Sequence, residues 1–241
     1  MADNVTPERI LIICAHPDDV DFGVAGSVAS WTASGIDVTY CIVTNGQAGS
    51  DDRTLTAAQI GAGRIIEQTA AAAVVGVTDL VWLGYADGVV ESTIGLRRDL
   101  SRVIRQVRPQ RVVTQSSELN LDRIFASHPD HLATGMAALA AVYPDSRNPH
   151  AHPELLAEGH EPWSVPELWL MAGPLTPERS RVHVDITDTI DLKIKALRCH
   201  VSQNGGWTEL DDMIKSWGTA TAKECGLPEG VLAEAFRRVI T

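Results

Sequence analysis

Short apolar runs alternate along this chain with longer segments in which apolar residues recur at helical spacing. Four of the runs are rich in β-branched residues, which predicts buried strands at 10–13, 37–43, 80–83 and 111–115. Amphipathic or Ala-rich segments between them predict helices over 22–32, from Thr56 to about Val75, and over 93–107. Strands and helices that alternate through short connections indicate a parallel sheet with helices on both faces.

The order of these elements is Rossmann-like, so we predict an α/β fold built on a mostly parallel sheet. Beyond residue 115 the pattern weakens, and an irregular segment over 116–125 leads into a helix predicted from about Ser127 to about Val142. Further strands are predicted at 167–171 and 181–186, and further helices at 190–202, near 208–224 and at 229–240. We expect a single domain over 1–241, with a Rossmann-like core at 1–145 and a smaller C-terminal α/β addition at 146–241 that shapes the pocket.

The stretch 143–166 interrupts this order. It is rich in Pro, His and Glu and shows little periodicity, so we interpret it as a long surface loop, and we leave open a role as a lid over the site. Substrate specificity is expected to arise from this stretch, from the loop 46–53 and from the C-terminal part.

Composition narrows the range of partners. The 241 residues carry a formal net charge of −11 at pH 7, which disfavours nucleic acid and anionic membranes because both require clustered Lys and Arg. A small-molecule substrate is expected, and a homo-oligomer stays open. No apolar run is long enough for a membrane span or a signal-peptide core. The four cysteines, 14, 41, 199 and 225, form no C-x-x-C pair, so we expect reduced thiols in a cytoplasmic protein.

The first chemical motif is His16-Pro17-Asp18-Asp19, which directly follows the first predicted strand. Open α/β sheets build their sites at the carboxyl ends of their strands. A histidine and two carboxylates at such a place suit metal binding or acid–base chemistry. Taken alone, the motif is more often a solvated turn, and a lone histidine is more often a surface or core residue.

The second motif is Ser127-His128-Pro129-Asp130-His131, after the fourth predicted strand. Ser127 and Asp130 have the spacing of an N-cap residue and the acid at N3, which predicts a helix start here. His128 and His131 are then three residues apart on one helical face. Because both motifs lie at carboxyl ends of parallel strands, we expect them to meet in one crevice.

Zinc binds His nitrogen and Asp oxygen, and a catalytic zinc site keeps one position for water. His16, Asp19 and His131 supply such a set, and Asp18 is then the carboxylate that accepts the water's proton. Asp130 is expected to hold the imidazole of His128 in a fixed orientation. No G-x-G-x-x-G follows the first strand, so a nucleotide-dependent enzyme is disfavoured.

The two motifs together resemble the paired signature of the PIG-L (LmbE-like) zinc deacetylases. The resemblance implies that His16, Asp19 and His131 bind zinc, that Asp18 is the general base and that His128 assists the transition state. Arg64, His200 and Gln203 are carried over as substrate-binding residues, with a surface salt bridge for Arg64 and helix packing for His200 and Gln203 as the alternatives.

The sequence departs from the family pattern at two places. Val20 and Asp21 stand where many relatives carry Glu, and Ala126 stands where some carry Tyr. The absence of that tyrosine removes one source of oxyanion stabilisation and weakens any inference of substrate from a single relative.

We therefore expect a zinc-dependent N-deacetylase that removes an acetyl or other acyl group from an amino sugar, such as an N-acetylglucosamine compound, or a related small amine. Iron(II) or another divalent ion is an alternative to zinc. Secondary metabolism, synthesis of a thiol cofactor and sugar salvage all stay open as the setting. The alternative function is a non-catalytic member of the same fold that binds a carbohydrate or a partner protein.

Overall fold

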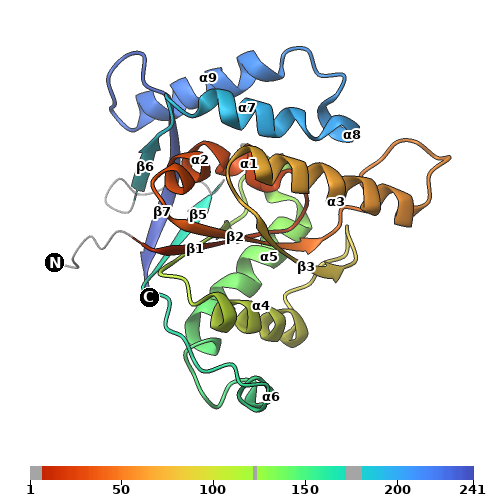
Figure 1. The fold of residues 1–241 in the computed structure, drawn as a ribbon, viewed down its shortest axis with the longest axis vertical. Helices are drawn as coiled ribbons and strands as arrows, with labels where there is room; N and C mark the ends of the chain where they lie inside the picture. Colours follow the sequence, from red (N-terminus) through yellow and green to blue (C-terminus); the bar gives the residue numbers. More distant parts are fainter. Residues whose placement is uncertain (1–6, 122–123, 172–180) are drawn as a thin grey trace.

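The computed structural model describes residues 7–121, 124–171 and 181–241, so residues 122–123 of the irregular segment lie outside the described part (Figure 1). Seven strands form one sheet in the order β3-β2-β1-β4-β5-β7-β6. Strands β1 to β5 pair in parallel, whereas β7 runs antiparallel to both β5 and β6. The prediction of an α/β fold with a mostly parallel sheet is confirmed. The strands are β1 (Arg9–Cys14), β2 (Asp37–Thr44), β3 (Asp79–Tyr85), β4 (Arg111–Gln115), β5 (Glu167–Met171), β6 (Arg181–Asp185) and β7 (Ala233–Ile240).

Helices cover both faces of the sheet because the central strands alternate apolar side chains between two cores. Ile10 and Ile12 of β1 pack toward one face, and Leu11 and Ile13 pack toward the other. In Figure 1 the first face is covered by α1 (Asp19–Gly23), α2 (Ala25–Ala33), α3 (Ala57–Val74) and α7 (Ile190–Arg198). The second face is covered by α4 (Ile94–Val107) and α5 (Pro129–Ala140).

Two predicted helices are divided in the structure. The helix predicted over 22–32 is interrupted at Val24, whose φ of −148° separates α1 from α2. The helix predicted over 190–202 ends at Arg198 and is followed by the short α8 (Val201–Asn204). The helix predicted near 208–224 is confirmed as α9 (Leu210–Glu224).

The helix predicted at 229–240 is wrong, because residues 233–240 form the strand β7. The segment contains Ala, Glu and Arg, which favour helices, so its local propensity points away from the structure. Pairing decides the outcome: β7 lies between β5 and β6 and bonds to both. Phe236 is buried against Trp169 of β5, with ring centroids 5.2 Å apart.

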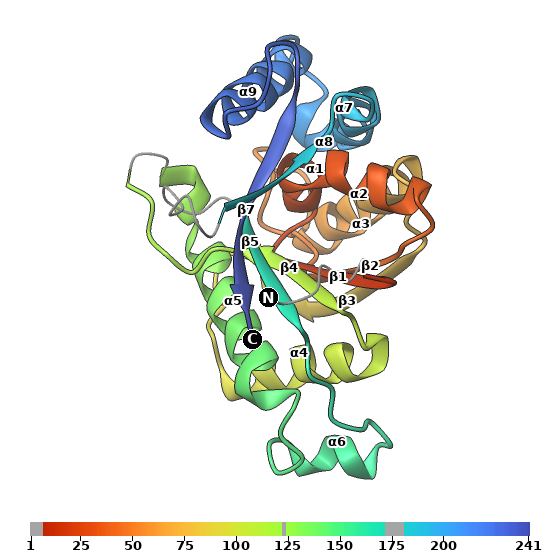
Figure 2. The same cartoon turned by 90° about the vertical axis from the view of Figure 1, so that its left-hand side faces the viewer.

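The stretch 143–166 lies away from the carboxyl edge of the sheet. Arg105, near the end of α4, donates to the carbonyl oxygens of Asp145, Asn148 and Ala151. Trp163 Nε1 donates to the carbonyl of Pro109, just before β4 begins. Figures 1 and 2 both place its short helix α6 (Pro153–Ala157) at the end of the molecule opposite α9. The interpretation of this stretch as a lid over the site is therefore wrong.

A buried ion pair ties the C-terminal strands to the first helices. Lys193 Nζ lies 2.5 Å from Glu234 Oε1 and 2.7 Å from the carbonyl oxygen of Phe22. The Glu234 carboxylate also accepts hydrogen bonds from the backbone N–H groups of Gly26 and Ser27, at the start of α2. No described helix is both long and apolar enough to cross a membrane.

Replacement of Lys193 by methionine is expected to lower the free energy of unfolding by about 3–5 kcal/mol, because it leaves the Glu234 carboxylate buried without its cation. Lys195→Met on the exposed side of the same helix is the matched control. Urea denaturation of the two variants measures the difference. Equal midpoints for both variants would show that the pair contributes nothing to stability.

Candidate metal and catalytic site

The turn after β1 carries the first motif to the point where the strand order reverses. The chain continues from β1 to β2 and β3 on one side of β1, and then returns to β4 on its other side. Ligands bind open α/β sheets at the point where the strand order reverses in this way. The side chain of Gln115, at the end of β4, accepts a hydrogen bond from the Ala15 N–H at 3.0 Å. The two strand ends are thereby fixed against each other.

Within the turn, Asp18 has a φ of 84°, a left-handed backbone that is unusual for a residue other than glycine. This conformation directs neighbouring carboxylates to different sides. Asp19 contacts His16 and His131, whereas Asp18 contacts Arg64. The two neighbouring carboxylates therefore have different partners.

The second motif begins α5 one residue later than expected. His128, and not Ser127, is the N-cap: its Nδ1 accepts from the N–H of Asp130 at 3.2 Å. Pro129 is then the first helical residue, which costs no hydrogen bond there. Ser127 Oγ instead accepts from the Asn120 N–H at 2.7 Å. His131 occupies the third helical position and points toward the turn after β1.

Three side chains from the two motifs bring their ring nitrogen and carboxylate oxygen atoms close together. His16 Nδ1 lies 3.2 Å from His131 Nε2 and 3.4 Å from Asp19 Oδ2, and His131 Nε2 lies 3.0 Å from Asp19 Oδ1. Ligands at zinc-bond lengths of about 2.0–2.1 Å in tetrahedral geometry stand about 3.3 Å apart. The spacing and the donor set of two nitrogens and one carboxylate both fit a zinc ion.

The other nitrogen of His16 is held by two carboxylates. His16 Nε2 lies 3.1 Å from Asp130 Oδ2 and 3.0 Å from Asp87 Oδ1. Asp130 is fully buried and accepts from the N–H groups of Gly88 and Val90 as well. Such carboxylates fix the proton of a ligand histidine on the nitrogen that faces away from the metal. This arrangement leaves Nδ1 of His16 free to bind an ion.

Asp130 therefore orients His16, whereas we expected its carboxylate to orient His128. Only the backbone N–H of Asp130 bonds to His128. Asp87 is a residue that sequence reasoning missed. It follows β3, so its place at a carboxyl strand end is the one signal that the sequence offers. His16, Asp87 and Asp130 form a second group that could hold a metal ion.

His128 lies beside the ligand atoms without a carboxylate of its own. Its ring centroid is 4.9 Å from that of His16 and 5.3 Å from that of His131. The nitrogen atoms of the three histidines come within 4.8 Å of one another, so they form a further candidate metal group. Burial, followed by the neighbouring His16 and His131, lowers the pKa of His128.

Charges within the group shift the pKa of each member. Burial disfavours the charged form of His16, but hydrogen bonds to Asp19 and Asp87 outweigh it and raise the pKa of His16 to about 11. Burial raises the pKa of Asp19, yet His131 and His16 hold it well below its usual range. The protonation of His16, Asp19 and His131 therefore depends strongly on the charges of the neighbouring side chains. A metal ion bound by these side chains would compete with protons for the same atoms.

Asp18 has a different environment. Its Oδ2 lies 3.2 Å from Arg64 Nη2, and its N–H donates to Gln68 Oε1 at 2.7 Å. Burial, followed by the charge of Asp19, raises the pKa of Asp18 to about 7, although Arg64 lowers it. A carboxylate with a pKa near neutrality is well matched to take up and release a proton at pH 7.

The structure places Arg64 inside the site. It is buried and donates to the carbonyl oxygens of Pro17 and Gly46 in addition to Asp18, so it holds the turn together. A Cβ at Gly46 would collide with its guanidinium group. Arg64 also lines a small cavity of about 200 Å³, together with Ala48, Gly49, Asp87, Gly88, His16 and His128.

His200 and Gln203 lie farther from the ligand atoms. His200 is fully buried, with Nε2 2.8 Å from Asp21 Oδ2, which also accepts from Gln68 Nε2 at 2.9 Å. His200 thus contacts Asp21, Asp21 accepts from Gln68, and Gln68 accepts from the Asp18 N–H. Gln203 Nε2 donates to the carbonyl of Gly49, in the loop beside the small cavity. Neither side chain lines the small cavity.

Two relatives of this chain are described as deacetylases. Diacetylchitobiose deacetylase of Thermococcus kodakarensis is 30% identical over 81% of this chain and 70% of its own length. A Bacillus anthracis protein described as probable N-acetyl-alpha-D-glucosaminyl L-malate deacetylase 2 is 29% identical over 81% of each chain.

A solved structure shares nearly the whole fold. N,N'-diacetylchitobiose deacetylase from Pyrococcus horikoshii, complexed with its inhibitor MPG, superposes with a TM-score of 0.87 over 97% of this chain and 84% of its own, at 28% identity. The family model PIG-L, described as GlcNAc-PI de-N-acetylase, matches residues 11–142, which contain both motifs. This chain therefore belongs to the PIG-L family.

Proposed function

We propose that this protein is a zinc-dependent N-deacetylase that removes an acetyl or other acyl group from the amide nitrogen of an amino sugar compound. The observation that carries the proposal is the close approach of His16 Nδ1, Asp19 Oδ1 and Oδ2 and His131 Nε2, with Asp18 beside them and paired with Arg64. The names of the relatives, which describe deacetylases of N-acetylated sugars, support the choice of substrate.

His16, Asp19 and His131 would hold the metal. When bound, a zinc ion supplies a Lewis acid for the amide carbonyl and makes a water acidic near neutral pH. Asp18 takes the proton of the attacking water and passes it to the amide nitrogen, so the C–N bond breaks with release of a free amine and acetate. Its contact with Arg64 and the hydrogen bond to Gln68 keep the carboxylate in place.

His128 is placed to stabilise the amide oxygen as it gains negative charge, because its ring adjoins both ligand histidines. It stands at the N-terminus of α5, where the helix dipole also favours negative charge. Loss of one such stabilising group commonly costs about a hundredfold or more in rate.

Two other functions fit less well. A carbohydrate- or partner-binding protein without catalysis would have no use for Asp18, a partly buried carboxylate in a left-handed turn that takes no part in the contacts among His16, Asp19 and His131. A nucleotide-dependent enzyme would need a turn that accepts a pyrophosphate, and the turn after β1 instead presents Asp18 and Asp19.

Treatment with a chelator is expected to abolish release of amine from N,N'-diacetylchitobiose and N-acetylglucosamine, and added zinc or iron(II) is expected to restore it. Amine release is followed with a fluorogenic amine reagent, and bound metal is quantified by elemental analysis. Comparison of the reloaded ions identifies the preferred metal. Metal uptake without amine release from any N-acetylated sugar would favour the binding function.

A further inference from the structure

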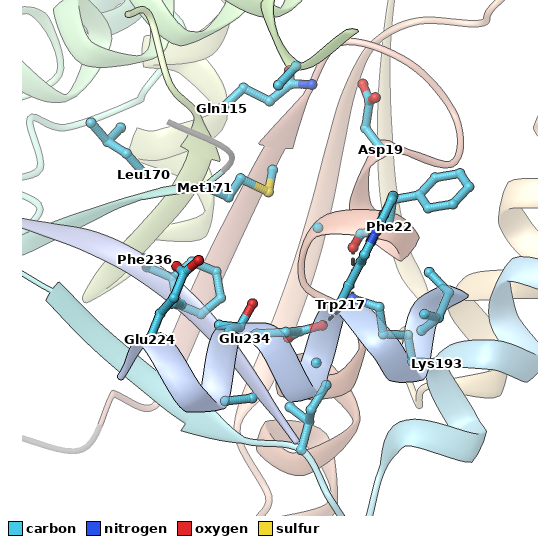
Figure 3. Close-up of a pocket in the computed structure, with 18 of the residues that line it drawn as sticks. Asp19, Phe22, Gln115, Leu170, Met171, Lys193, Trp217, Glu224, Glu234 and Phe236 are labelled. Atoms are coloured by element: carbon cyan, nitrogen blue, oxygen red, sulfur yellow. Dashed lines mark hydrogen bonds and ion pairs between the residues drawn. The ribbon is translucent and has the colours of Figure 1, made fainter. Parts of the chain in front are cut away.

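A second and much larger cavity adjoins His16, Asp19 and His131, which we call the ligand group. Its volume is about 860 Å³, and Asp19 and His131 form part of its wall. Figure 3 shows Asp19 and Gln115 at one end, with Glu224, Glu234 and Phe236 toward the other. The small cavity beside Arg64 and His128 lies on the side of His16, so the ligand group stands between two spaces of different size.

The wall of the large cavity is predominantly apolar and aromatic. Much of it comes from α1, β5, α9 and β7, and β4, α5, β6 and α7 contribute further residues. Its large apolar side chains include Phe22, Met171, Ile186, Ile214, Trp217 and Phe236. A cavity of this volume is near the upper end of the range that holds a drug-sized ligand. The wall is contributed mainly by the C-terminal part of the chain, outside the 11–142 match to the family model.

Several polar groups of the wall are engaged by other parts of the protein. Lys193 and Glu234 pair with each other and with the start of α2. Gln115 Oε1 accepts from the Ala15 N–H. Arg181 and Glu224, which carry opposite charges, lie toward the α9 end. The described wall therefore offers a ligand mostly hydrophobic contact.

Exposed apolar side chains also flank the lining residues Asn120 and Phe125 in the sequence. Leu119, Leu121, Ile124 and Phe125 are 56%, 75%, 63% and 62% exposed, and Phe125 itself lines the cavity. Large exposed apolar groups that adjoin a pocket mark a surface that binds apolar ligands. Among the described residues, the cavity wall and these exposed side chains are thus both apolar.

We propose that the substrate carries an extended apolar group, an alkyl chain or aryl group of roughly eight carbons or more, which occupies this cavity while the amide lies at the ligand group. The proposal rests on the proposed deacetylase function. The apolar group can belong either to the sugar's aglycone or to the acyl chain, and both place hydrocarbon in the same space.

Two substrate series separate these sources. The first is N-acetylglucosamine with methyl, butyl, hexyl and octyl groups on the anomeric oxygen, and the second is glucosamine N-acylated with acetyl, butanoyl, hexanoyl and octanoyl groups. Along the series that uses the cavity, kcat/KM is expected to rise roughly two- to fourfold for each methylene that becomes buried. Hydrolysis that is flat or falling along both series would overturn the proposal.

A substitution on α9 tests the location. Thr221→Phe narrows the cavity and is expected to lower the octyl-to-methyl ratio of kcat/KM at least fivefold, whereas Thr219→Phe, on the exposed side of the same helix, keeps the parent ratio. An unchanged ratio in Thr221→Phe would contradict the location.

Calorimetric binding to metal-loaded Asp18→Asn distinguishes failure of this proposal from failure of the proposed function. Octyl N-acetylglucosaminide is expected to bind at least tenfold more tightly than the methyl compound and with a more negative heat-capacity change. Tighter octyl binding without turnover by the parent protein would overturn the deacetylase function and keep the apolar site. Turnover with equal binding of both compounds would overturn the apolar site alone.

Discussion

Asp18→Asn is expected to lower kcat for amide hydrolysis by about 10²- to 10⁴-fold while the protein keeps its metal, because an amide of the same shape cannot accept the water's proton. The side chain of Asp18 contacts Arg64 and takes no part in the contacts among His16, Asp19 and His131. The ligand group should therefore survive the change. Steady-state amine release and elemental analysis of the same preparation measure both effects.

Asp37→Asn is a matched control, since Asp37 is exposed at the start of β2, beside the amino end of β1, and is expected to give the parent kcat. Turnover of Asp18→Asn within threefold of the parent would remove Asp18 from the reaction. Loss of metal together with activity would instead identify it as a ligand.

His131→Ala is expected to abolish metal binding and turnover together, because it removes one of three ligand atoms. Asp130→Asn should lower metal affinity less, by about ten- to a hundredfold. The Asp130 carboxylate contacts Nε2 of His16 and not the Nδ1 atom that is assigned to the metal. Competition with a zinc-binding dye measures the affinity of each variant. This order of effects separates a ligand from a residue that orients a ligand.

His183→Ala, at an exposed position on β6, is the control and is expected to bind zinc like the parent protein. Parent-like zinc affinity in His131→Ala would contradict the ligand set. Greater loss in Asp130→Asn than in His131→Ala would favour the alternative group of His16, Asp87 and Asp130.

Much of the fold follows from local pattern. The β-branched runs predict β1 to β4, and the sheet order then brings the ends of β1 and β4 side by side. This adjacency is the reason that His16, Asp19 and His131 could be grouped before any geometry was known. Neighbouring parallel strands end at the same edge, so residues that follow them converge.

Features that depend on distant contacts could not be predicted in the same way. Strand β7 contains helix-favouring residues, and its pairing with β5 and β6 overrides that propensity. Asp87 is a single carboxylate in a turn, and nothing in its spacing identifies His16 as its partner. The N-cap at His128 depends on a bond from Asp130 that competes with the equally plausible cap at Ser127.

The large cavity could not be predicted from local pattern either, because its wall comes from segments that lie far apart in the sequence. Residues of α1, β5, α9 and β7 contribute to it. Each segment taken alone has the composition of an ordinary core element. Their arrangement around Asp19 and His131, which only the assembled fold provides, gives them a role in substrate selection under the proposal above.

The most direct test is X-ray diffraction at the zinc absorption edge from crystals of the zinc-loaded protein. The anomalous peak is expected about 2.0–2.2 Å from His16 Nδ1, an oxygen of Asp19 and His131 Nε2. A peak at His16 Nε2 with Asp87 and Asp130 as its ligands, or a peak away from both motifs, would contradict the assignment of the metal site.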